Sequence, residues 1–183
     1  MDLYLTAKFV HVTAAVLWLG GGLSLMLLAA LSRRAGQRDD LFTTIRLVTV
    51  LAPRVFVPGS MIVLLTGLAM IWSGGLALDA WLVFGLAGIA VTIAIGMLKL
   101  GPLSGQVTGL VAAGDRGAAA AAAGSLIRAA RVDYVLQFLI VFAMVAKPSW
   151  SDAGLLIGMA AIAGLAALTL LGGARPSTQH GAA

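Results

Sequence analysis

The sequence predicts an all-α protein, a polytopic bundle of transmembrane helices with a four-helix core and a fifth span at the C-terminal end. Hydrophobic residues make up 61% of the 183 residues and charged residues only 10%, whereas soluble domains carry roughly a quarter charged residues. The mean hydropathy is +1.04. Five apolar stretches have about the length, roughly 20 residues, that a helix needs to cross the hydrocarbon core of a bilayer.

The predicted spans cover residues 5–31, 55–72, 81–100, 132–146 and 153–171. The first run is longer than the roughly 7–15 apolar residues of a signal peptide, so we expect a permanent helix. The fourth has the shortest apolar core and carries Asp133 and Gln137, which favours a tilted helix or one sheltered inside the bundle. We expect a single transmembrane domain over residues 1–175 and a disordered cytoplasmic tail over 176–183.

Two connections also have helical character. Apolar residues at 41, 45, 48 and 52 form a stripe that ends at Pro53, which predicts an interfacial helix or a forward extension of the second span. Pro58 should kink that span one turn inside it. The alanine run 118–123, with a glycine on either side, predicts a short cytoplasmic helix.

Basic residues are unequally divided between the two ends of the predicted bundle. Ten lie after the first and third spans or in the tail, and two, Lys8 and Lys147, lie on the other side. The positive-inside rule predicts a multi-pass protein of the bacterial inner membrane with its N-terminus outside and its C-terminus cytoplasmic. The net charge of +5 is expected to face anionic lipids of the bilayer, not nucleic acid.

His11 is the only histidine inside a predicted span. An ionisable side chain at that depth costs free energy unless it is partnered, so it is expected to face the bundle interior and to mark a functional site. The alternative is a neutral imidazole that donates to a helix carbonyl. Trp18 lies two turns further along the same face. The glycines at 20–22, with Gly21 at their centre, admit either another helix or a flat cofactor.

Other candidate ligands lie at a similar depth. Met70 and Met144 carry thioethers that suit haem iron or Cu(I), although methionine in apolar helices also serves as packing. Lys8 and Lys147 are candidates for pairing with a haem propionate or another anion. The absence of cysteine excludes thiolate metal sites, Cys-ligated iron–sulfur clusters and covalently attached haem.

A second polar cluster is expected at the cytoplasmic end. It contains Arg54, Lys99, Arg131, Asp133 and Gln137. We expect an ion-pair network in which Arg54 or Arg131 neutralises Asp133 and fixes the helix ends. A proton or quinone site is the alternative.

Several motifs together resemble a family of small bacterial integral membrane proteins. They are Lys8-Phe9-Val10-His11, Leu17-Trp18-Leu19-Gly20-Gly21-Gly22, Pro58-Gly59, Leu65-Thr66-Gly67, Asp133-Tyr134 and Met144-Val145-Ala146-Lys147-Pro148. That family is distantly similar to the HemJ-type protoporphyrinogen oxidases, which bind haem b, and to the CopD-type copper-resistance membrane proteins. The similarity implies a four-helix core whose first-helix histidine, here His11, ligates haem or metal. HemJ-type proteins also have an important lysine in the third helix, which residues 81–98 lack, so the resemblance argues against porphyrin oxidation.

The leading hypothesis is therefore a redox-linked or metal-handling membrane protein that binds haem b, or copper, through His11. Its predicted cofactor-binding residues are Lys8, His11, Trp18, Gly21 and Met144. The sequence does not separate an enzyme from a haem carrier, and a redox partner is left open. The main alternative is a non-catalytic accessory subunit or scaffold without a cofactor, associated with a membrane complex or with copies of itself, because no acid–base or nucleophile constellation is present. A transporter is the third hypothesis. It ranks last because too few polar residues line the spans.

Overall fold

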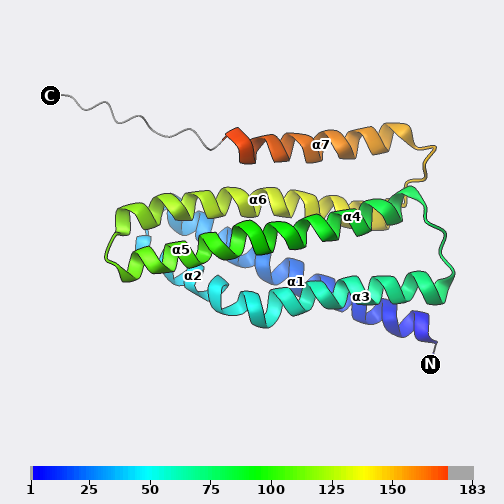
Figure 1. Cartoon of the computed structure of the whole chain (residues 1–183), viewed down its shortest axis with the longest axis horizontal. Helices are drawn as coiled ribbons and strands as arrows, with labels where there is room; N and C mark the ends of the chain where they lie inside the picture. The colour runs from blue at the N-terminus through cyan, green and yellow to red at the C-terminus, as the bar shows by residue number, and fades with distance from the viewer. Residues whose placement is uncertain (1, 173–183) are drawn as a thin grey trace.

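Four long helical rods make up the body of the protein (Figure 1). The computed structural model describes residues 2–172, and within them no strand occurs. In chain order the helices are α1 (Leu3–Arg34), α2 (Arg38–Leu51), α3 (Val57–Gly74), α4 (Ala80–Ile95), α5 (Gly101–Ala112), α6 (Arg116–Ala146) and α7 (Ala153–Gly172), and two π-helical segments, η1 (Ala52–Phe56) and η2 (Gly96–Leu100), interrupt the regular helix. The predicted all-α bundle with a four-helix core and a further C-terminal helix is confirmed.

The rods are longer than the predicted spans, because the π-helical segments join helices end to end. The four are Leu3–Arg34, Arg38–Gly74, Ala80–Ala112 and Arg116–Ala146, and each is long and apolar enough to cross a membrane. A helix of 32 residues such as α1 is about 48 Å long, whereas the hydrocarbon core is roughly 30 Å thick. The rods therefore extend well beyond the core of a bilayer.

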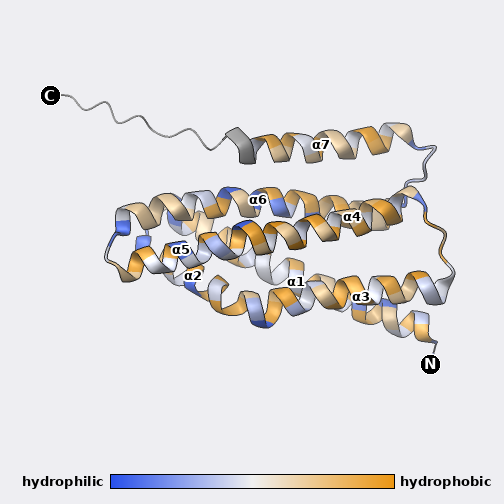
Figure 2. Ribbon diagram, viewed as in Figure 1, coloured by the Kyte–Doolittle hydropathy of each residue, from blue (hydrophilic) through white to orange (hydrophobic). Residues whose placement is uncertain are grey.

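Tight turns return the chain at each end of the bundle. Gly36, Gly75 and Gly114 have positive φ angles of 72°, 57° and 81°, the left-handed conformation that ends helices and that glycine adopts without strain. The turns at Gly36 and Gly114 lie at one end, hereafter the basic end. Figure 2 shows hydrophilic residues gathered there, whereas apolar residues predominate along α3 and α4.

The tightest packing lies towards the basic end, where α1, α2, α5 and α6 meet. Its buried residues are Ala29, Leu41, Phe42, Ile45, Val107, Ala119, Ala123, Leu126 and Ile127. A smaller cluster of Ala14, Val63 and Ile89 lies nearer the opposite end. The outward faces carry large apolar side chains such as Phe9, 71% exposed, and Leu17, 64% exposed. Such a surface suits lipid rather than water.

The segment before the second span is its forward extension, as one of the two sequence alternatives proposed. The regular helix α2 ends at Leu51, just before the proline where the apolar stripe ends, and the rod continues through η1, which contains Pro53, into α3. Proline removes a backbone donor and crowds the preceding turn, and a π-helical turn accommodates both effects. The irregularity is therefore at η1, and Pro58 lies in the first turn of α3.

The alanine run 118–123 is not a separate short helix, which corrects the sequence prediction. It forms the first turns of α6 and packs against the neighbouring rods, with Ala119 and Ala123 fully buried. Gly124 lies inside α6, and the guanidinium of Arg33 packs over it, at 2.7 Å from where a Cβ would lie. The small side chains thus permit close helix approach rather than ending a helix.

The fifth predicted span is a shorter apolar helix, α7, which packs on α6 outside the four rods (Figure 1). The connection before it is fixed to the α3–α4 loop by the Trp150 backbone N–H, which donates to Asp79 Oδ1 at 3.2 Å. In the same connection the backbone N–H and hydroxyl of Ser149 donate to Asp152, and this lowers the pKa of the Asp152 carboxyl. The predicted tail at 176–183 lies outside the described residues.

Candidate cofactor-binding site

The imidazole of His11 is held by α3 through one nitrogen. Nδ1 lies 2.9 Å from the carbonyl oxygen of Val63 and 3.1 Å from the hydroxyl of Thr66. Because a carbonyl oxygen only accepts, Nδ1 carries the proton and Nε2 of the neutral ring keeps its lone pair. Histidines that ligate metals characteristically donate their other nitrogen in this way, which fixes both tautomer and orientation.

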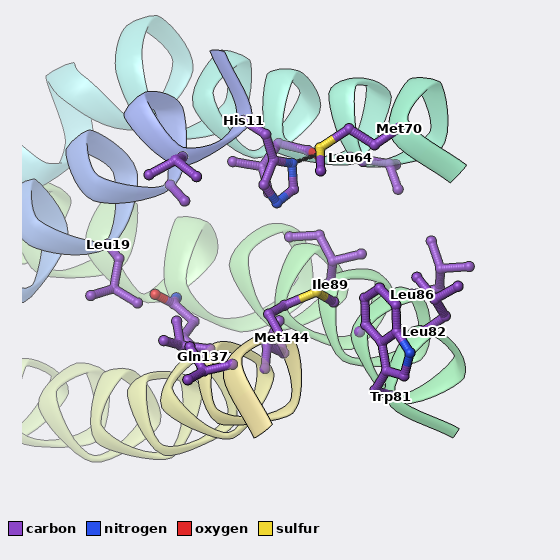
Figure 3. A pocket seen from close by; sticks show the side chains of 18 of the residues that line it. His11, Leu19, Leu64, Met70, Trp81, Leu82, Leu86, Ile89, Gln137 and Met144 are labelled. Atoms are coloured by element: carbon purple, nitrogen blue, oxygen red, sulfur yellow. Dashed lines mark hydrogen bonds between the residues drawn. The ribbon is translucent and has the colours of Figure 1, made fainter. Parts of the chain in front are cut away.

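The free face of His11 opens onto a cavity of about 430 Å³ between α1, α3, α4 and α6. Figure 3 shows the ring pointing from α1 across the gap towards Gln137 and Met144 on α6. The lining is almost entirely apolar, with His11 and Gln137 among its few polar side chains. Cofactor and small-molecule sites are commonly of this kind, apolar cavities of roughly 300–1,000 Å³ with a few placed polar groups.

Two methionines border the same cavity. Met70, on α3, lies beside His11, and Met144, on α6, lies across the gap (Figure 3). The structure therefore brings one imidazole and two thioethers to a single cavity, although they come from three different rods. Sequence analysis identified all three side chains but had no means of showing that they share a cavity.

Three glycines leave space for side chains that line the cavity, because each lacks the Cβ that would contact them. A Cβ at Gly59 would lie 3.4 Å from Trp18, and one at Gly67 would lie 3.3 Å from His11 Cε1. At Gly85 a Cβ would collide with the methyl of Met144. Sequence reasoning missed these roles. The signal was a glycine in the middle of an apolar helix, where glycine costs about 1 kcal/mol relative to alanine and so needs a reason.

The other predicted site residues lie outside the cavity. Gly21 is exposed and does not line it, and a Cβ there would approach only Phe56, at 3.7 Å. Lys8 is exposed and is also absent from the lining. Lys147 is better placed, because its ammonium lies 5.3 Å from the ring centroid of Trp81, a lining residue. The backbone N–H of Trp81 donates in turn to Pro148 at 3.1 Å, which fixes this rim of the cavity.

The predicted ion-pair network around Asp133 is wrong. Asp133 is buried and accepts a 2.7 Å hydrogen bond from Gln137 Nε2. Arg54 instead donates to the Val50 carbonyl, and Arg131 is exposed. Within residues 2–172 the one ion pair joins Arg116 to Asp39 at the basic end. Arg131 and Asp133 are two residues apart on α6, and residues at that spacing point in different directions.

Residues 5–148 match the model of a family described as predicted integral membrane protein, DUF2269. The chain belongs to this family. Every residue that lines the His11 cavity lies inside the part that the DUF2269 model covers, whereas α7 lies beyond it. No curated protein and no solved structure matches this DUF2269 chain. The comparisons give no similarity to HemJ-type or CopD-type proteins.

Proposed function

We propose that this DUF2269 protein binds haem b in the His11 cavity, with His11 Nε2 as an axial ligand, and takes part in electron transfer in the membrane. One observation carries the proposal: the imidazole is oriented through Nδ1 by Val63 and presents its other nitrogen to an apolar cavity of cofactor size. In a site that binds haem, the iron supplies one-electron chemistry and the protein supplies ligands and surroundings.

The rest of the cavity suits a flat apolar group with an anionic edge. Its apolar walls would exclude water from a porphyrin face, and Trp18 gives a flat side chain beside it. The thioethers of Met70 and Met144 are the candidates for a second axial ligand. Lys147, held over Trp81 at the rim, is the cation available to a propionate.

Copper is the second candidate, because the two thioethers and the imidazole form a soft ligand set. Cu(I) accepts such ligands, whereas a hard cation would prefer oxygen. For either cofactor we propose the membrane orientation that the basic residues predict, with the basic end in the cytoplasm of a bacterium. The His11 cavity would then lie towards the outer face, where a redox partner would meet it.

Titration of the purified, haem-free chain with haemin tests the proposal directly. We expect saturable binding of one haem per chain, followed by its Soret absorbance, with affinity lowered at least tenfold in His11→Ala. The matched control is His180→Ala, at the other of the two histidines in the sequence, which should leave the affinity unchanged. Binding that is unsaturable, or equal in the two variants, would contradict it. A parallel Cu(I) titration separates the candidates: copper bound by His11 in a chain that does not bind haem would favour copper handling. A chain that binds neither would favour the accessory-subunit alternative.

A further inference from the structure

A second cavity, of about 520 Å³, lies inside the bundle and is lined by α1 to α6 and by both π-helical segments, η1 and η2. It is nearer the basic end than the His11 cavity, since Ile45, Leu126 and Ile127 of the tightly packed core form part of its wall. Trp18 and Gln137 line both cavities and therefore lie between them. The proposed haem site does not account for this second space.

Two buried oxygen atoms at this cavity have no partner among the described residues. They are Oδ1 of Asp133 and Oε1 of Gln137, on side chains only 5% and 4% exposed. The two side chains are joined by one hydrogen bond, from Gln137 Nε2 to Asp133 Oδ2, which leaves their other oxygen atoms without a donor. A buried acceptor without a donor costs about 1–3 kcal/mol, and native proteins keep few of them. The cavity has hydroxyl groups but no lysine, arginine or histidine in its lining, and no described group donates to these two oxygens, so they point to a ligand that brings its own donor.

The two π-helical segments border this same cavity. Pro53 and Phe56 of η1, and Gly96 and Met97 of η2, belong to its lining. π-Helical turns are rare and occur frequently at functional sites. The presence of two π-helical segments at one cavity does not depend on the unpartnered acceptors. It is a second indication of a binding site.

The lining narrows the class of ligand. Aromatic rings of Trp18, Phe56 and Tyr134 and the thioethers of Met26, Met61 and Met97 surround the space, which suits a flat ring. A carboxyl group accepts from a hydroxyl when ionised and donates to a carbonyl when protonated, so it can match both the quinol and the quinone form of one ring. We propose that this cavity binds the head group of a membrane-soluble quinone, with Asp133 and Gln137 as its hydrogen-bonding partners.

The proposal concerns binding and stands apart from the haem proposal. The probe is decylubiquinol, the reduced form whose two hydroxyl groups supply the missing donors, titrated without oxygen into the full-length haem-free chain in lipid nanodiscs, with binding measured by calorimetry. We expect saturable binding of one molecule per chain, weakened at least tenfold by Asp133→Leu. Leucine removes the unpartnered Oδ1 but also leaves the buried Gln137 Nε2 without its acceptor, so thermal unfolding should first show that the variant is folded. Asp40→Asn, at an exposed aspartate near the basic end, is the control and should bind as the unaltered chain does.

A second variant tests the cavity without touching Asp133. Gly96 belongs to the lining and a Cβ there would meet nothing within 4 Å, so Gly96→Leu has room to narrow the cavity and should weaken binding at least tenfold. Gly105→Leu, at an exposed glycine that is equally open, is its control. His11→Ala should bind the quinol normally, which separates this site from the haem site. Absent or unsaturable binding, binding unaffected by both Asp133→Leu and Gly96→Leu, or binding of dodecylamine in place of the quinol would overturn the proposal.

Discussion

His11 on α1 donates from Nδ1 to the backbone carbonyl of Val63 on α3, at 2.9 Å across the interface of the first two rods. This contact orients a side chain that is costly inside a membrane, in the way that metal-ligating histidines are oriented. The structural alternative for His11, a neutral ring that donates to a helix carbonyl, accounts for one nitrogen. It does not account for the cavity that the other nitrogen faces.

The hydroxyl of Thr66 is the second group near Nδ1, at 3.1 Å. Because groups that orient a ligand affect binding by about 10–100-fold, Thr66→Val should weaken haem binding by about tenfold while leaving the fold intact. Haemin titration of the purified variant measures this. Thr13→Val, at an exposed position on α1, is the control, and equal affinities in the two variants would show that Thr66 has no role in orienting the ring.

Gly67 should be intolerant of any side chain. Its Cβ would lie 3.3 Å from His11 Cε1, so alanine must shift the ring by a few tenths of an ångström and valine by more. We expect haem affinity to fall progressively in Gly67→Ala and Gly67→Val, measured by the same titration. Gly20→Ala has open space around its Cβ and should bind haem normally. Normal binding by Gly67→Val would mean that the ring position is not important.

The core near the basic end should dominate stability. Ile45 is 1% exposed at the meeting point of four helices, so Ile45→Ala should lower the free energy of unfolding by about 2–5 kcal/mol. Leu17, on an outward face and 64% exposed, provides the comparison, and Leu17→Ala should change stability little. Unfolding in detergent monitored by circular dichroism compares the two. Similar losses from both substitutions would place the stabilising core elsewhere.

The orientation of the bundle can be read with single cysteines, since the chain has none of its own. Ala77 lies exposed in the α3–α4 loop, and Ala113 lies exposed in the α5–α6 turn at the basic end. In intact cells a membrane-impermeant maleimide should label Ala77→Cys and not Ala113→Cys, which should react only after permeabilisation. The reverse pattern would place the basic end outside.

Much of the fold could be predicted from hydropathy alone, because a bilayer demands long apolar helices and the turns between them are polar. The continuity of α2 with α3 was one of two alternatives that the sequence left open, and the continuity of α4 with α5 was not predicted. Proline at 53 indicates a helix end when only local preferences are considered, and a π-helical turn that absorbs it depends on the packing of neighbouring rods.

The candidate site shows the same division. His11 and Trp18 were identifiable because a polar or aromatic side chain is conspicuous on an apolar helix. The close contacts at Gly59, Gly67 and Gly85 depend on which helix each glycine faces, and one sequence does not contain that information. The partner of Asp133 was mispredicted for a related reason: closeness in sequence to Arg131 does not place both side chains on one face.

The absorption spectrum of the full-length chain, purified in detergent from cells supplied with haem and copper, tests the central claim most directly. The account predicts a Soret band with about one haem per chain, lost in His11→Ala and retained in His180→Ala. A colourless protein without bound metal, obtained folded from cells in which a control haem protein is fully loaded, would contradict it.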